Sequence, residues 1–67
     1  MLLNPDDASA YFYRGEAYYL KKNYDRALAD LGDAIRLNAN DADSFYLRGV
    51  IFTDQEKYTR AVVEFDQ

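Results

Sequence analysis

The chain alternates between stretches in which apolar residues recur every three or four positions and short polar breaks. Tyr11, Gly15 and Tyr18 stand at positions i, i+4 and i+7, so they occupy one face of a helix. No stretch alternates with period two over a useful length, so we predict an all-α fold without strands. After a polar break over residues 21–23, a second helical stripe contains Tyr24, Ala27, Leu28, Leu31, Ala34 and Ile35.

The polar breaks carry residues that commonly begin helices. Asp7, Asn23 and Asp41 each stand before or at the start of an apolar-periodic stretch. Side-chain oxygens at such positions accept hydrogen bonds from backbone N–H groups of the first helical turn. These signals predict four helices, over residues 8–21, 24–37, 42–55 and 58–67.

The whole pattern repeats after 34 positions without a gap. Nine of the 33 pairs of residues compared at this offset are identical, which is several times what composition alone gives. The repeat divides the chain into a first unit over residues 8–41, a truncated second unit over residues 42–67, and a tail of a preceding unit over residues 1–7. The identical pairs include Arg14 with Arg48, Gly15 with Gly49, Tyr24 with Tyr58 and Ala27 with Ala61.

Small residues on the inward stripes explain how each helical pair closes. Gly15 and Ala27 allow two helix backbones to approach closely while larger side chains fill the space around the crossing. Gly49 and Ala61 repeat this arrangement in the second unit. Because a mid-helix glycine costs about 0.5–1 kcal/mol relative to alanine, its recurrence indicates a packing requirement.

These residues resemble the tetratricopeptide repeat (TPR), a 34-residue helix–turn–helix unit with the pattern W-x2-L-G-x2-Y, then A-x3-F, then P. Gly15, Tyr18 and Ala27 match that pattern outright, and the resemblance covers essentially all of the chain. Three residues depart from the pattern: Arg14 and Arg48 at the Leu place, and Ala39 at the closing Pro. The remaining signature places hold Tyr11 and Leu31 in the first unit, and Phe45, Gly49, Phe52, Ala61 and Phe65 in the second.

The resemblance implies antiparallel helix hairpins stacked as a short right-handed α-solenoid, in which the first helix of each unit lines a concave groove. In this family the groove binds a peptide or protein segment. Aromatic residues and carboxylates lie together on the predicted groove face, which favours a basic partner segment. The alternative is that its aromatic residues pack on neighbouring helices. The groove face comprises Ser9, Phe12, Glu16 and Tyr19 in the first unit, and Asp43, Tyr46, Val50 and Thr53 in the second.

Some TPR grooves hold a C-terminal carboxylate with a clamp of Lys, Asn and Arg side chains. The equivalent face here offers Phe12, Glu16, Tyr46 and Val50 instead. We therefore expect that tails ending in acidic residues do not bind. For Arg14 and Arg48 we expect a structural ion pair or packing of the side-chain stem rather than recognition of a ligand.

Composition excludes several classes of function. Eight basic against twelve acidic residues give a net charge of −4 and a pI near 4.5, which argues against nucleic-acid binding. The chain has neither Cys nor His, so thiolate chemistry and the commonest metal ligand are missing. The run from Asn38 to Asp43 fails the calcium-loop pattern, which needs Gly and Glu at fixed places. We predict no enzyme activity, no metal and no cofactor.

The apolar runs span only a few residues, so we expect no membrane span, and the first residues do not resemble a secretory signal. These features do not establish a compartment; a cytoplasmic location is the default.

A repeat unit of this kind does not bury its apolar faces alone, and about three units are usually needed for stability. Two interpretations follow. The chain is a piece of a longer array that acts as a protein-binding scaffold, or copies of it associate through their open ends by stacking or by swapping helices. The second interpretation makes it a structural self-association module and a homo-oligomer. A natural fragment and an engineered one both fit this pattern.

Overall fold

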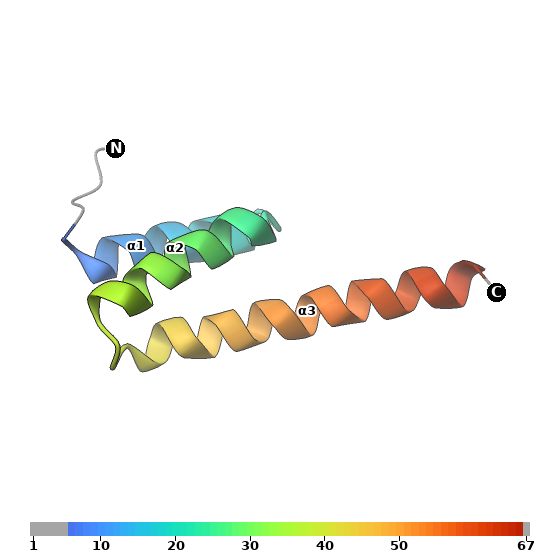
Figure 1. Ribbon diagram of the computed structural model, residues 1–67. Helices are drawn as coiled ribbons and strands as arrows, with labels where there is room; N and C mark the ends of the chain where they lie inside the picture. Colours follow the sequence, from blue (N-terminus) through green and yellow to red (C-terminus); the bar gives the residue numbers. More distant parts are fainter. Residues whose placement is uncertain (1–5, 67) are drawn as a thin grey trace.

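The computed structural model describes the backbone of residues 6–66 and the side chains of residues 6–59. It contains three helices, α1 (Ala8–Leu20), α2 (Tyr24–Leu37) and α3 (Ala42–Asp66), and no strand within the described residues (Figure 1). The all-α prediction is confirmed, and α1 and α2 agree with the helices predicted over residues 8–21 and 24–37. Most of the predicted tail, residues 1–5, and the side chains of Ala61 and Phe65 lie outside the described residues.

The predicted capping residues begin the helices. Asp7 accepts hydrogen bonds from two backbone N–H groups in the first turn of α1. Asn23 accepts one from the N–H of Arg26 at 3.4 Å. Asp41 accepts from the backbone N–H of Ser44 at 3.2 Å and from its hydroxyl at 2.6 Å. Each cap satisfies donors that have no partner inside the helix.

The turn between α1 and α2 depends on a residue in the left-handed region. Lys22 has φ of 62°, a conformation that costs a non-glycine residue about 1–2 kcal/mol. Its N–H donates to the carbonyl of Tyr19 at 2.8 Å, and the N–H of Asn23 donates to that of Tyr18 at 2.9 Å. This pair of bonds is the Schellman arrangement that ends helices. The chain then reverses, and Asn23 begins α2.

The second unit differs from the prediction, because α3 is one helix where two, over residues 42–55 and 58–67, were expected. The residues 34 positions after the first turn are Gln55, Glu56 and Lys57. All three are good helix formers, and a lysine at the place of Asn23 has no oxygen that accepts a hydrogen bond. The helix therefore continues through the point at which the first unit turns.

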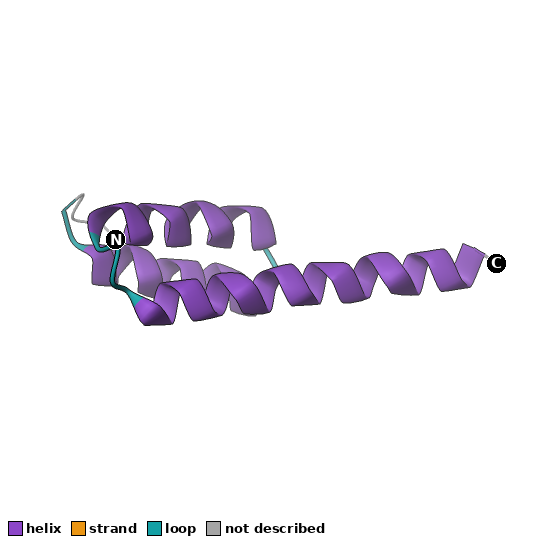
Figure 2. Cartoon of the chain, turned by 60° about the horizontal axis from the view of Figure 1, so that its bottom comes forward, coloured by secondary structure: helices purple, strands orange, loops and turns teal. Residues whose placement is uncertain are grey.

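The core lies where α2 packs between α1 and the first half of α3 (Figures 1 and 2). Ala27, Leu31 and Ala34 of α2 are fully buried together with Ile51 of α3. Half-buried aromatic and leucine side chains surround this cluster. The second half of α3 extends past the end of the hairpin, as Figure 2 shows.

The crossing of α1 and α2 confirms the expected role of Gly15. A Cβ atom at this position would lie 3.3 Å from the carbonyl oxygen of Ala27 and 3.3 Å from side-chain atoms of Asp30 and Leu31. Next to it, Arg14 donates from Nε and Nη2 to the two carboxylate oxygens of Asp30, both at 2.7 Å. This hydrogen-bonded ion pair raises the pKa of Arg14, and it satisfies an aspartate that is only 3% exposed.

Candidate functional site

The α1 side of the predicted groove is only partly available to a ligand. Phe12 and Tyr19 are half-buried and pack against the core cluster around Leu31. Ser9 and Glu16 are exposed. Phe12 and Tyr19 therefore pack on neighbouring helices, which is the alternative given for the aromatic residues of the groove face, and only part of each side chain is exposed to solvent.

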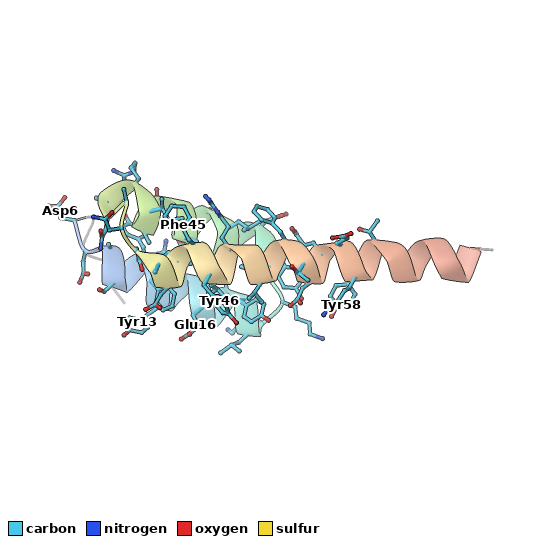
Figure 3. All side chains as sticks on the ribbon, turned by 90° about the horizontal axis from the view of Figure 1, so that it is seen from below. Asp6, Tyr13, Glu16, Phe45, Tyr46 and Tyr58 are labelled. Atoms are coloured by element: carbon cyan, nitrogen blue, oxygen red, sulfur yellow. The ribbon has the colours of Figure 1, made fainter. Side chains whose placement is uncertain are left out.

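The α3 side is more open. Tyr46 is 75% exposed, Asp43 and Thr53 are exposed, and Val50 is half-buried. Thr53 donates its hydroxyl to the carbonyl of Gly49 at 3.0 Å, so its polar atom is satisfied within the helix. In Figure 3, Glu16 of α1 and Tyr46 of α3 lie along the same edge of the molecule.

A shallow hollow of about 570 Å³ lies along the outer surface of α3. Three of the predicted groove residues line it, together with four residues that were not predicted for the groove. The lining contains no residue of α1, so the hollow is a feature of α3 alone. Tyr46, Val50 and Thr53 were predicted for the groove. Phe45 and Gly49 were predicted as signature residues of the repeat, and Asp54 and Lys57 were not predicted for the groove.

A hydrogen bond joins the two sides of the predicted groove. The hydroxyl of Tyr19 in α1 donates to Asp54 in α3 at 3.0 Å, and this bond raises the pKa of Tyr19. The two residues are 35 positions apart, one more than the repeat period. The period therefore contained a signal for Asp54, because it places equivalent helices of adjacent units side by side.

Three tyrosines continue this contact towards the α1–α2 turn. The rings of Tyr19 and Tyr24 lie 6.1 Å apart, and those of Tyr24 and Tyr58 lie 6.3 Å apart. Burial raises the pKa of Tyr24, with a further contribution from Tyr58. The Lys22 ammonium, 5.9 Å from the ring centre of Tyr58, lowers the pKa of Tyr58. The cluster attaches the middle of α3 to the end of the hairpin.

The described residues contain no group of His, Cys, Asp and Glu side chains arranged to hold a metal ion. Within the same part of the chain, no helix combines the length and apolar character that crossing a membrane requires. The exposed side chains on the predicted groove face include the ring of Tyr46 and the carboxylates of Glu16 and Asp43.

A comparison with known protein families agrees with this helical architecture. A family model described as a TPR repeat matches residues 15–55, which is more than half of the chain. The chain belongs to the tetratricopeptide repeat family. Its resemblance to TPR units is thereby confirmed, and TPR units are non-catalytic modules that generally mediate protein–protein interaction. No curated protein and no solved structure matches this TPR chain significantly.

Proposed function

We propose that this TPR chain binds a protein or peptide segment on the predicted groove face, along its α3 side. The observation that carries the proposal is the hollow on α3 with the 75%-exposed ring of Tyr46 at its edge. A tyrosine supplies a large contact area at a small cost in side-chain entropy, which is why such rings dominate binding energy at interfaces.

The charges around this face favour a basic segment. Glu16 and Asp43 are exposed there, and Asp54 lines the hollow, against one lysine, Lys57. Carboxylates at the rim of an interface attract a positive partner and accelerate its association. The Lys, Asn and Arg clamp for an acidic C-terminus has no counterpart at these positions, so the same surface disfavours acidic tails.

Calorimetric titration with two short peptides tests this function. Both peptides carry alternate leucines; one has lysines between them and the other has glutamates. We expect the lysine peptide to bind and the glutamate peptide to give no heat. Equal binding of both peptides, or micromolar binding of an acidic C-terminal tail, would contradict the proposal.

Two variants locate the binding surface. Tyr46→Ala should weaken binding of the lysine peptide by about thirtyfold or more, because removing an aromatic anchor costs about 2 kcal/mol or more. Leu20→Ala is the matched control, since Leu20 is 74% exposed but is not a groove residue. Phe12→Ala is a weaker test because Phe12 also packs against the core.

A further inference from the structure

A second hollow adjoins the one on α3. It has a volume of about 230 Å³, and its lining comes from the end of the α1–α2 hairpin and from the middle of α3. Asp54 lines both hollows. Tyr58, which lines the second hollow, lies farther along α3 than Tyr46, which lines the first (Figure 3). A segment bound along α3 can therefore reach both hollows across Asp54.

Asp54 is a partly covered carboxylate without a cationic partner among the described side chains. It is half-buried, and its Oδ2 atom accepts a hydrogen bond from the hydroxyl of Tyr19 at 3.0 Å. No lysine or arginine within residues 6–59 forms an ion pair with it. Asp30 differs, because both of its oxygens accept hydrogen bonds from Arg14. Asp54 therefore keeps its Oδ1 atom as an acceptor for a ligand.

Aromatic rings line the second hollow beside this carboxylate. They belong to Tyr19, Tyr24 and Tyr58, and neighbouring ring centres lie 6.1 and 6.3 Å apart. The faces of such rings are negative and attract cations. The chain itself shows this attraction, since the ammonium of Lys22 lies 5.9 Å from the ring centre of Tyr58. Leu20 borders the hollow too, but it is 74% exposed and has neither charge nor ring, so the Leu20→Ala control leaves these groups in place. The carboxylate and the rings together favour a positive charge.

Partial burial distinguishes Asp54 from the exposed carboxylates of the groove face. Glu16 and Asp43 are exposed, and water and salt screen charges strongly at such positions. Asp54 is half-buried next to aromatic rings, where a pair of opposite charges is screened less. One cationic side chain beside Asp54 should therefore contribute more to binding than one at the rim.

We propose that Asp54 and the rings of Tyr19, Tyr24 and Tyr58 form a subsite for one lysine or arginine side chain of the bound segment. The ammonium or guanidinium group donates to Oδ1 of Asp54 and lies against the tyrosine rings. Lys22 lines the same hollow and is a competing positive charge. This inference rests on the proposed function, because it names the part of a basic segment that the chain recognises.

Removal of one charge at a time tests the subsite. Asp54→Asn and Asp43→Asn each remove one carboxylate, and calorimetry measures the affinity of each variant for the lysine peptide and for the same peptide with arginines. We expect Asp54→Asn to weaken binding of at least one of the two peptides by at least about tenfold. Asp43→Asn should weaken it by less than about threefold, because Asp43 is exposed. Equal losses in the two variants would indicate general charge attraction and would overturn the subsite.

The Asp54→Asn variant separates recognition of a cation from support of the fold. Its amide oxygen still accepts a hydrogen bond from the hydroxyl of Tyr19, so the contact between α1 and α3 is kept while the charge is lost. Circular dichroism should therefore show the helix content of the parent chain. If helix content falls together with binding, Asp54 acts through the fold, and its role as the acceptor of the subsite is refuted.

Two neighbouring lysines give a second, independent test. Lys22→Asn removes the competing ammonium, and asparagine tolerates the left-handed conformation that Lys22 adopts with φ of 62°. We expect this variant to bind the lysine peptide at least about threefold more tightly. Lys21→Asn is the matched control, because Lys21 is exposed and lines neither hollow. The same gain in both variants, or no gain in Lys22→Asn, would place the cation outside this hollow.

Failure of the subsite and failure of the proposed function give different results. Peptide binding that Tyr46→Ala weakens and Asp54→Asn leaves intact would keep the proposed function and overturn the subsite.

If neither peptide binds the parent chain, the proposed function is wrong, and n-butylammonium, which reproduces the lysine side chain, probes the subsite directly. We then expect saturable shifts in the NMR signals of the Tyr19, Tyr24 and Tyr58 rings, and loss of these shifts in Asp54→Asn. Absence of saturable shifts in the parent chain would refute the subsite.

Discussion

Residues 8–37 and residues 42–66 carry nearly the same pattern, yet the first stretch folds back as α1 and α2 while the second runs straight as α3. Identical residues therefore have different surroundings: Gly15 is covered by α2 and Arg14 pairs with Asp30, whereas Gly49 is exposed and no carboxylate of the described side chains pairs with Arg48. The comparison teaches that the turn, and not the apolar stripe, decides whether a TPR unit closes. Asn23 caps the helix after the first turn, and Lys57 stands at its place in the second.

The largest difference between the two regions should appear in the buried core. Leu31→Ala removes a fully buried side chain, so we expect the free energy of unfolding to fall by about 2–5 kcal/mol. Phe52→Ala is the control on α3, where a half-exposed ring should cost no more than about 0.5 kcal/mol in the monomer. Urea unfolding at low protein concentration measures both. A large cost for Phe52→Ala under these conditions would show that α3 is already covered within one chain.

The two arginines provide the next comparison. Arg14→Met leaves the buried carboxylate of Asp30 without its hydrogen-bond donors, and we expect a loss of about 2 kcal/mol. Arg48→Met removes only a contact with the exposed ring of Phe45, so the monomer should lose well under 1 kcal/mol. The same unfolding experiment measures both variants. Equal losses would mean that Arg48 has a carboxylate partner in the monomer.

A change in free energy of similar size should convert the straight α3 into a helical hairpin like that of α1 and α2. The double variant combines Glu56→Gly with Lys57→Asn. The glycine accepts the left-handed conformation that a turn needs, and the asparagine supplies an N-cap for a second helix. Together these favour a turn by about 2 kcal/mol. Spin labels on cysteines substituted at Asp43 and Asp66 should report about 35 Å in the straight helix and a much shorter distance in the hairpin.

Dilution with unlabelled chain confines that measurement to one copy. Gln55→Ala is the matched control, because it changes the same region without adding a turn or a cap. A distance that stays near that of the straight helix in the double variant would show that contacts, and not turn chemistry, keep α3 straight.

The smallest effect concerns the tyrosines that join the two regions. Lys22 lowers the pKa of Tyr58, and the bond to Asp54 raises the pKa of Tyr19. On raising the pH, Tyr58 should ionise before Tyr19, and the stability that Tyr19 contributes should be lost only as the pH passes its raised pKa. The tyrosinate absorbance of the parent, of Tyr58→Phe and of Tyr19→Phe is followed as the pH is raised. The difference between the parent and each variant gives the titration of the missing tyrosine, and so the order in which the two ionise. The reverse order would show that the middle of α3 is detached from the hairpin.

Most of the first unit was predictable from local signals. The caps at Asp7, Asn23 and Asp41, and the approach allowed by Gly15, depend on residues close to one another or on a face of fixed period. The straight course of α3 differs from the prediction, because the 34-residue repeat implies a second turn, whereas Lys57 offers no cap at the place of Asn23.

The predicted groove residues remain a prediction, and the structure divides them between two roles. Phe12 and Tyr19 pack inwards, while Tyr46 stands out from α3. A helical period places residues on a face but does not say what lies opposite that face. For that reason the helical period did not identify Lys57, which lines the hollow.

The sequence by itself determined the helical fold, the 34-residue period, the capped starts of the helices and membership of the TPR class, because each follows from residue types at fixed spacings. Only the tertiary structure decided that the second unit stays open, that Asp30 pairs with Arg14, and that Tyr19 joins Asp54. Those outcomes depend on which surfaces meet when distant residues pack, and spacing along the chain does not specify that.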